Sequence, residues 1–335
     1  MRFLDAVKMS YGVVHNTWIA PRPYVLYIKP TARCDCRCRI CKRWQTPSDK
    51  SEEMSTAEFV TVMRTFRELG AVVLVAWGGE PLLRSDIGEL FREAKRLGYR
   101  TSMCTNGRQL ARRADEVMPW LDTVLCSLDG YGPNHDAARG VDGVFDRMLE
   151  GIRAASRYGG KRIKLWASLH ADNYDDIEPI ARLAKELGVW VDYFPVATVE
   201  GHNDAMILDR EGRARAFEKV IELKRRGYPV WNFDAVLRKM RDTAPFRCNF
   251  GQLALQVDHR GYVASCENPD GSPLYPWGRY DEVDWRALFA SERFAAARAD
   301  LARCGKCRMP CVMEMSDSLL ASYASQFARS LKRGA

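Results

Sequence analysis

The stretch TAEFVTVMRTFRELGAVVLVAWGGEP, residues 56–81, indicates the fold of this chain. Its first part has apolar residues at helical spacing and ends at a glycine, as helices commonly do. A short, continuous apolar run follows, which is typical of a strand buried on both faces. A helix followed by such a strand is the repeating unit of a parallel α/β sheet, because each parallel connection needs a crossover.

The same alternation extends in both directions along the chain. After about residue 205 it gives way to longer helical patterns and to an alternating stretch, 253–266, that is typical of a hairpin turning at His259-Arg260-Gly261. We therefore predict an N-terminal helical segment (1–23), an α/β domain (24–205) and a smaller C-terminal domain (206–335). The predicted strands are 24–31, 71–77, 100–104, 123–129, 162–170 and 189–197, and the predicted helices are 56–70, 86–98, 109–118, 145–159, 175–188, 210–228 and 285–304.

The composition limits the class of protein. With 335 residues, 47% of them apolar, the chain is long enough to bury a large core. Lys and Arg outnumber Asp and Glu by 51 to 43, a net charge of +8. This mild excess suits an anionic substrate or cofactor, and the absence of a basic stripe argues against a nucleic-acid partner. We find no secretory signal and no apolar run as long as a membrane span, so we predict a cytoplasmic location.

Eleven cysteines are many for such a chain, and they are unevenly placed. Four lie within 34–41 and five within 248–311, which leaves Cys104 and Cys126 isolated. Disulfides are disfavoured in the cytoplasm. Clustered cysteines in a reducing compartment indicate bound metal.

The first group, CDCRCRIC, follows the first predicted strand. Cys34, Cys38 and Cys41 have the spacing C-x3-C-x2-C, and ligands of parallel α/β folds gather at the carboxyl ends of strands. Three thiolates on one loop can hold three irons of a [4Fe–4S] cube and leave the fourth iron open. We interpret Cys36 as a spare thiol. The alternative, a zinc knuckle, needs four ligands that usually come in C-x-x-C pairs, and no second pair lies nearby.

This loop resembles the cluster loop of the radical SAM enzymes. In that family S-adenosylmethionine (SAM) chelates the open iron, and an electron from the cluster releases a 5′-deoxyadenosyl radical that takes hydrogen from a substrate. The resemblance covers about residues 24–200. It implies a partial (β/α)6 barrel that is open on one side, and it places the backbone of Ile40 beside the adenine.

Further motifs at the predicted strand ends support the resemblance. They are WGGEP (77–81), CTNG (104–107), SLDG (127–130) and HDAARG (135–140). The resemblance implies that Gly78, Gly79 and Glu80 bind the methionyl ammonium of SAM, although a G-G-E sequence alone is commonly a plain turn. Arg139 is a candidate for the SAM carboxylate, or else a surface residue at the start of a helix. The other SAM candidates are Thr105, Asn106, Ser127, Asp129 and Ser168.

The second group of cysteines brackets the predicted hairpin and continues in CGKCRMPC, residues 304–311. It resembles the twitch and SPASM extensions of radical SAM enzymes, which bind auxiliary [4Fe–4S] clusters. Five cysteines imply one auxiliary cluster, for electron transfer if closed or for substrate binding if one iron is open. A structural zinc site is the alternative. The candidate ligands are Cys248 and Cys266 with two or three of Cys304, Cys307 and Cys311.

The substrate is the least determined part of the prediction. Only 33 residues precede Cys34, too few for a leader-peptide-binding domain, so we predict hydrogen abstraction from, or addition to, a non-peptide small molecule, sugar or lipid. An external donor of the flavodoxin or ferredoxin type would supply electrons. The alternatives are a peptide maturase with a separate leader-binding partner and a non-catalytic iron–sulfur or zinc protein. Trp166, His170, Asp192 and Tyr193 are candidates for lining the substrate cavity.

The two ends of the chain carry apolar faces at helical spacing, in residues 1–18 and 318–333. Either face could rest on a membrane. We predict instead that both pack against the ends of the barrel.

Overall fold

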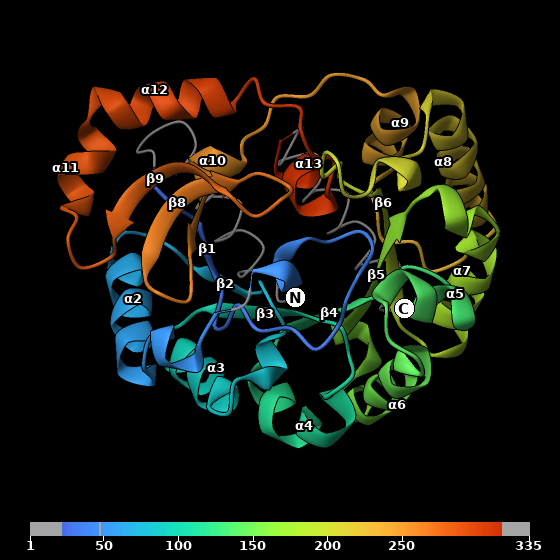
Figure 1. Cartoon of the computed structure of the whole chain (residues 1–335), viewed down its shortest axis with the longest axis horizontal. Coiled ribbons are helices and arrows are strands. Elements are labelled where there is room, and N and C mark those ends of the chain that lie inside the picture. Colours follow the sequence, from blue (N-terminus) through green and yellow to red (C-terminus); the bar gives the residue numbers. More distant parts are fainter. Residues whose placement is uncertain (1–21, 47, 317–335) are drawn as a thin grey trace, which may run out of the picture.

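A computed structural model describes residues 22–46 and 48–316 of the chain. All six predicted strands form, and they pair in chain order in one parallel sheet, with helices along its outer side (Figure 1). The predicted α/β fold with a partial barrel is therefore confirmed. The strands are β1 (Val25–Ile28), β2 (Val73–Ala76), β3 (Arg100–Thr105), β4 (Thr123–Ser127), β5 (Ile163–Leu169), β6 (Trp190–Pro195), β7 (Ala254–Val257), β8 (Tyr262–Glu267) and β9 (Pro273–Arg279).

In the barrel, the helices form close to the residue ranges that the sequence predicts. Short 3₁₀ turns, among them η4 (Pro81–Leu83) and η7 (Ala171–Asp176), lie in several of the connections. The α-helices are α2 (Thr56–Glu68), α3 (Ile87–Arg96), α4 (Leu110–Val117), α5 (Pro133–Arg139), α6 (Val144–Ser156), α7 (Ile177–Glu186), α8 (Arg210–Arg225), α9 (Asp234–Asp242), α10 (Phe250–Leu253), α11 (Trp285–Ala290), α12 (Glu292–Leu301) and α13 (Pro310–Ser316).

Local sequence signals explain where α2 begins and ends. Ser55 caps its first turn through a capping box: the Ser55 hydroxyl accepts from the backbone N–H of Glu58, and the Glu58 carboxylate accepts from that of Ser55. Gly70 follows the helix in a positive-φ conformation that other residues rarely adopt. Phe59 and Phe66 of α2 are fully buried against the sheet. Burial of such aromatic side chains, at about 25 cal/mol per Å² of apolar surface, is the main force that holds the helix layer to the strands.

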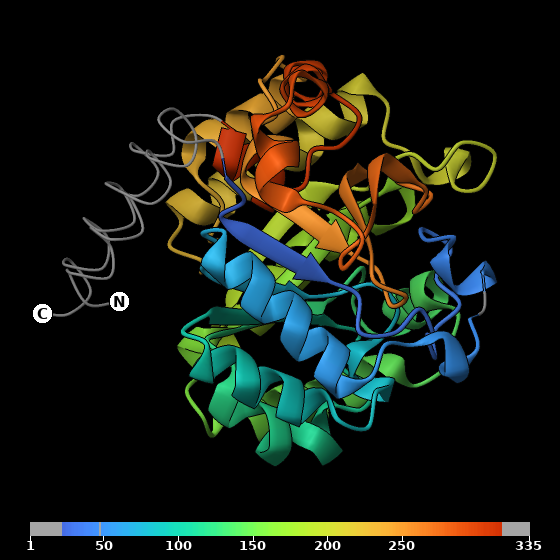
Figure 2. The same ribbon diagram turned by 90° about the vertical axis from the view of Figure 1, so that its left-hand side faces the viewer.

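The C-terminal hairpin joins the barrel sheet directly. β7 pairs in parallel with β1, β8 pairs antiparallel with β7, and β9 pairs with β8, so the nine strands have the order β6-β5-β4-β3-β2-β1-β7-β8-β9. Figure 2 shows the C-terminal elements, in orange and red, gathered above the N-terminal half. The predicted hairpin turn is present, since Gly261 has a positive φ between the two strands.

The remaining differences from the sequence prediction are local. The helix predicted at 285–304 is two helices, because the extended backbone of Ser291 ends α11 and its hydroxyl caps α12. Helices α5, α9, α10 and α13 and strand β9 were not predicted. The apolar faces of residues 1–18 and 318–333 lie outside the described residues. Among the residues that are described, no helix is long and apolar enough to cross a membrane.

Candidate active site

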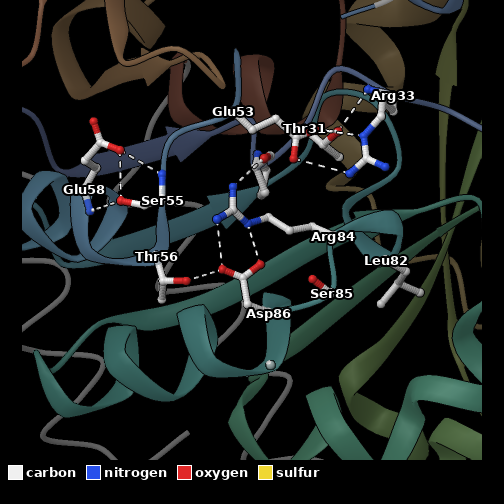
Figure 3. A network of polar contacts seen from close by, with 12 residues as sticks. Thr31, Arg33, Glu53, Ser55, Thr56, Glu58, Leu82, Arg84, Ser85 and Asp86 are labelled. Carbon is white, nitrogen blue, oxygen red and sulfur yellow. Dashed lines mark hydrogen bonds and ion pairs between the residues drawn. The ribbon is translucent and has the colours of Figure 1, made fainter. Parts of the chain in front are cut away.

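The cysteine-rich loop begins at the carboxyl end of β1 and is anchored by two ion-pair networks (Figure 3). Glu53 accepts hydrogen bonds from the Thr31 hydroxyl and from the Arg33 guanidinium. The buried Arg84 pairs with Asp86 and also donates to the Pro30 carbonyl at 3.1 Å. The residues that these networks hold, Pro30, Thr31 and Arg33, come just before Cys34 in the sequence. The networks therefore fix the direction in which the chain enters the loop.

The middle of the loop is held by α5 and by the end of β3. The backbone N–H groups of Arg37 and Arg39 donate to the carbonyls of Arg139 and Ala138 at 2.9 Å. On the other side, Asp35 accepts from the Asn106 side-chain amide at 2.7 Å. These contacts hold the loop between two strand-end segments that the sequence also singled out.

The four cysteines of the loop lie in one small apolar cluster with Val144. Cys36 and Cys38 are buried, whereas Cys34 and Cys41 are partly exposed. The Cys36 thiol hydrogen-bonds with both Cys34 and Cys38, and these two bonds raise its pKa. Cys36 is thus a packed thiol that lies between two candidate ligands.

The three candidate ligands differ in how readily they ionise. The hydrogen bond from Cys36 lowers the pKa of Cys38 to about 6, and the nearby Arg139 guanidinium adds to this effect. The same kind of bond from Cys36 lowers the pKa of Cys34, while burial raises the pKa of Cys41. Thiolates are the form that binds metal, so two of the three positions favour it already.

The donor set of this loop fits a [4Fe–4S] cluster. Each cysteine of such a cluster ligates a different iron. Cys34 and Cys38 lie on either side of Cys36, and Cys41 is close enough for their charges to influence its pKa. Among the described residues, no group of three His, Cys, Asp or Glu side chains is arranged to hold a single metal ion.

Backbone hydrogen bonds join the glycine motif after β2 to the start of the cysteine loop. Gly79 donates to the Thr31 carbonyl at 3.2 Å, and the backbone of Glu80 donates to the Arg33 carbonyl at 2.8 Å. A Cβ on Gly79 would lie 2.1 Å from the Arg33 carbonyl oxygen, which is far inside contact distance. Gly78 has a φ of 111°, which favours glycine. The structure therefore explains why glycine occupies both positions, which the sequence alone did not show.

Glu80 is buried, and its carboxylate organises two neighbouring strand ends. It accepts hydrogen bonds from the backbone N–H groups of Leu82 and Asn106 and from the Thr105 hydroxyl. Burial raises its pKa to about 7, against these three bonds that favour the charged form. Three donors occupy part of the carboxylate's capacity, and one acceptor position remains. The contact of Glu80 with the SAM ammonium stays a prediction.

The ends of β4 and β5 share a second carboxylate, Asp129. It accepts from the backbone N–H and the hydroxyl of Ser168 and forms an ion pair with Arg139 at 2.6 Å. Arg139 also lies 3.6 Å from the Cys38 sulfur. Ser127 closes β4 and is partly exposed. Arg139 is thus a largely buried residue at the end of α5 that pairs with Asp129, and its predicted contact with SAM stays a prediction.

The Arg139–Asp129 pair leads to a stability prediction. Both side chains are nearly buried, with 11% and 2% of their surface exposed. Arg139→Met is expected to lower the free energy of unfolding by about 3–5 kcal/mol, because it leaves a buried carboxylate without its partner. Denaturant unfolding of the two proteins measures the difference. Asp115→Asn, which breaks an exposed pair with Arg157, serves as the control and should change stability by less than about 1 kcal/mol.

A buried histidine beside this pair predicts a pH dependence. His135 accepts a hydrogen bond from the Asp129 N–H through Nδ1, and burial lowers its pKa to about 3. The unfolded chain binds this proton below about pH 6.5 and the folded chain does not, so stability is lost as pH falls through that window. Between pH 7 and pH 5 the wild-type protein should lose about 2 kcal/mol more than His135→Asn. Equal losses in urea titrations at the two pH values would contradict this.

The second group of cysteines opens onto a cavity inside the sheet. The cavity has a volume of about 440 Å³, and Cys248, Cys266, Cys304 and Cys307 all line it. Burial, together with the charges of the other three, raises the pKa of Cys307 to about 12, so the four sulfurs are near one another. Cys311 lies in α13, but its side chain is outside the described residues.

The same cavity receives inward-facing side chains from the barrel strands. Trp166 and Asp192 line it, as predicted for substrate-facing residues. His170 and Tyr193 do not line it: His170 is buried against the Asp129 carbonyl, and the Tyr193 hydroxyl donates to the Ile177 carbonyl in the core. Cys104 faces the cavity and Cys126 faces the helices in the core.

An ion-pair bridge between the two cysteine groups was not predicted. Glu267, next to Cys266, pairs with Lys29 and, at 2.8 Å, with Arg43, which lies two residues after Cys41. Arg43 and Lys29 also face the ring of Trp77. The position of a charged residue beside each cysteine group was visible in the sequence, but the pairing of β1 with β7 that brings them together was not.

Comparison with known proteins agrees with this geometry. Residues 28–184 match the radical SAM superfamily. Pre-heme d1 synthase of Dinoroseobacter shibae is 30% identical over 171 residues, 50% of this chain and 42% of that relative, so this match spans less than half of the relative's length. PqqA peptide cyclase of Ruegeria pomeroyi is 28% identical over 280 residues, 80% of this chain and 74% of the relative.

Solved structures with low sequence identity share the fold. SuiB of Streptococcus suis bound to S-adenosylmethionine has a TM-score of 0.69 at 16% identity, over 91% of this chain and 76% of that chain. The structure of anSMEcpe with bound AdoMet and the Cp18Cys peptide has a TM-score of 0.65 at 16% identity, over 93% and 98%. At these identities the likeness establishes the architecture alone.

The partial barrel and its three-cysteine loop lie in a radical SAM domain, the part of the chain (28–184) that matches the radical SAM superfamily. The cofactors of this superfamily are a [4Fe–4S] cluster and SAM, so the cofactor prediction for the first site is confirmed. The auxiliary cluster remains a prediction, as do the individual roles of the SAM candidates.

The predicted small-molecule, sugar or lipid substrate is wrong. The relative that matches most of the chain is named for a peptide, and SuiB and anSMEcpe were solved with peptides bound. The error lay in the inference from the short stretch before Cys34. The length of that stretch does not decide the substrate, because a separate partner can bind a leader peptide.

Proposed function

We propose that the protein is a radical SAM peptide maturase, which modifies a peptide with the help of a separate leader-binding partner. When bound, the cluster and SAM supply a 5′-deoxyadenosyl radical that abstracts a hydrogen atom. PqqA peptide cyclase, which matches 280 residues of this chain, supports a peptide substrate. The peptide complexes of SuiB and anSMEcpe support it further. In this proposal the protein works in the cytoplasm and takes electrons from an external flavodoxin or ferredoxin type of donor.

The loop after β1 is the proposed cluster site, with Cys34, Cys38 and Cys41 as ligands. In this proposal Cys36 packs the loop and is not a ligand, which its burial between two ligands supports. The strand-end residues that border the loop are the proposed SAM contacts. They are Gly78, Gly79, Glu80, Thr105, Asn106, Ser127, Asp129, Arg139 and Ser168, together with Ile40 of the loop itself. Arg139 also pairs with Asp129 and lies 3.6 Å from the Cys38 sulfur.

The observation that best supports the proposal is that residues of the barrel strands and the C-terminal cysteines line the same cavity. A cavity of about 440 Å³ suits an amino-acid side chain with its adjoining backbone. In this proposal residues 24–205 generate the radical, and 206–335 hold an auxiliary cluster on Cys248, Cys266, Cys304 and Cys307. Such a cluster, facing the same cavity, would accept an electron from the modified residue.

Isotope transfer tests the substrate class. The full chain is reconstituted anaerobically and given unlabelled SAM and dithionite. The substrate source is an extract of cells that naturally contain this protein, grown in deuterated medium. We expect deuterium to appear in 5′-deoxyadenosine, measured by mass spectrometry, when the peptide fraction is present. Treating that fraction with proteinase before the reaction should remove the label. Label that comes equally from a protease-resistant, low-mass fraction would contradict a peptide substrate.

A further inference from the structure

Two carboxylates face one end of the shared cavity. Asp192 projects from β6 and Glu314 from α13, and both belong to the cavity wall. Only 1% of Asp192 is exposed. Within the described part of the chain, neither Asp192 Oδ1 nor Glu314 Oε1 has a hydrogen-bond partner. Each therefore presents an acceptor that the fold itself does not satisfy.

Two lysines, Lys164 and Lys224, lie around this pair. Lys164 lies 3.5 Å from Asp192 Oδ2 and 3.9 Å from the centre of the Trp231 ring. The other lysine that faces the pair, Lys224, forms an ion pair with Asp234 and also donates to a backbone carbonyl. The charges of both lysines thus act on the two carboxylates, but Asp192 Oδ1 and Glu314 Oε1 still have no hydrogen-bond donor among the described residues.

Leaving buried carboxylates without donors is energetically costly. This cost disfavours the charged form of both groups and so raises their pKa values. Burial raises the pKa of Asp192. Burial, followed by the charge of Asp192, raises the pKa of Glu314 to about 8. A ligand cation at this position would supply the missing donors and favour the charged form of both carboxylates.

The rest of the cavity suits the hydrocarbon part of such a ligand. The aromatic rings of Tyr27, Trp77, Trp166 and Phe250 form much of its wall. Long basic side chains lay their methylene groups on apolar surfaces and keep only the charged end among polar groups. Building on the proposed function, we propose that a lysine or arginine side chain of the peptide enters this cavity and places its charged end on Asp192 Oδ1 and Glu314 Oε1.

Two matched probes test this proposal without turnover. Nα-acetyl-lysine methylamide and Nα-acetyl-norleucine methylamide differ only by the terminal ammonium group. Their affinities for the reconstituted full chain are measured by saturation-transfer NMR titration. We expect the lysine compound to bind at least about tenfold more tightly, since each tenfold corresponds to about 1.4 kcal/mol. Equal binding of the two probes, or no lysine binding up to about 10 mM, would overturn the proposal.

Two variants connect the preference to this end of the cavity. Asp192→Asn and Glu314→Gln each keep the shape of the side chain, and either should weaken lysine binding about tenfold while norleucine binding changes less than about threefold. Asp115→Asn, an exposed carboxylate on α4, should leave both affinities unchanged. Survival of the lysine preference in both cavity variants would overturn the proposal. Since no SAM cleavage is involved, this result is independent of whether the chain proves to be a peptide maturase.

Discussion

Cys38→Ala is expected to lower the rate of 5′-deoxyadenosine formation at least about a thousandfold, because it removes one of three proposed ligands of the cluster that must hold SAM. Iron content should fall by about four atoms per chain after reconstitution. Cys38 is buried, is bonded by Cys36 and lies 3.6 Å from Arg139. The measurement is chromatography of the anaerobic reaction, with iron counted in the same sample.

Cys36→Ala is the matched control for this prediction. It removes the same kind of side chain from the same loop, two residues away, and from an equally buried position. It should keep its full iron content and stay within about threefold of the wild-type rate, since alanine fits the apolar cluster around Val144. If the two variants lost activity equally, or if only Cys36→Ala lost it, the proposed assignment of ligands would be wrong.

Gly79→Ala is expected to have the second-largest effect. Its new Cβ would meet the Arg33 carbonyl oxygen at 2.1 Å and the Ala32 carbonyl carbon at 2.8 Å, both of them backbone atoms with little freedom to move. The cysteine loop or the glycine loop must then shift by about an ångström, and shifts of that size in an active site can cost about a hundredfold in rate. Binding of SAM, measured by equilibrium dialysis, should weaken at least about tenfold.

Gly201→Ala separates the clash from a general effect of losing a glycine. Gly201 has a φ of 70°, and a Cβ there would meet nothing within 4 Å. The variant should therefore cost only about 1–2 kcal/mol of backbone strain and keep normal SAM affinity. Normal SAM binding by Gly79→Ala would show that the contact between the two loops does not shape the SAM site.

The barrel could be predicted from the sequence because its signals are local. A strand such as β2 is a short apolar run between a glycine and the next motif, and every strand of the barrel meets its neighbour in chain order. The C-terminal part depended on a long-range pairing instead. No local pattern in 254–257 shows that β7 lies beside β1 rather than in a separate domain.

The candidate site divides in the same way. The cysteine loop and the Gly78–Glu80 segment are contiguous motifs, and the structure brings them together at the carboxyl ends of β1 and β2. Arg139 could be selected from its motif, but its commitment to Asp129 required the geometry of α5. The Asp192–Glu314 pair joins residues 122 positions apart that carry no motif, so only their common cavity reveals them.

The central claim is that the three-cysteine loop makes this chain a catalyst of reductive SAM cleavage. The most direct measurement is 5′-deoxyadenosine production by the anaerobically reconstituted full chain, with SAM and dithionite, in a sample of known iron content. The account predicts its formation at more than one equivalent per chain, together with an EPR signal of the reduced cluster that changes when SAM is added. A fully iron-loaded protein that forms no 5′-deoxyadenosine, and whose EPR signal ignores SAM, would contradict it.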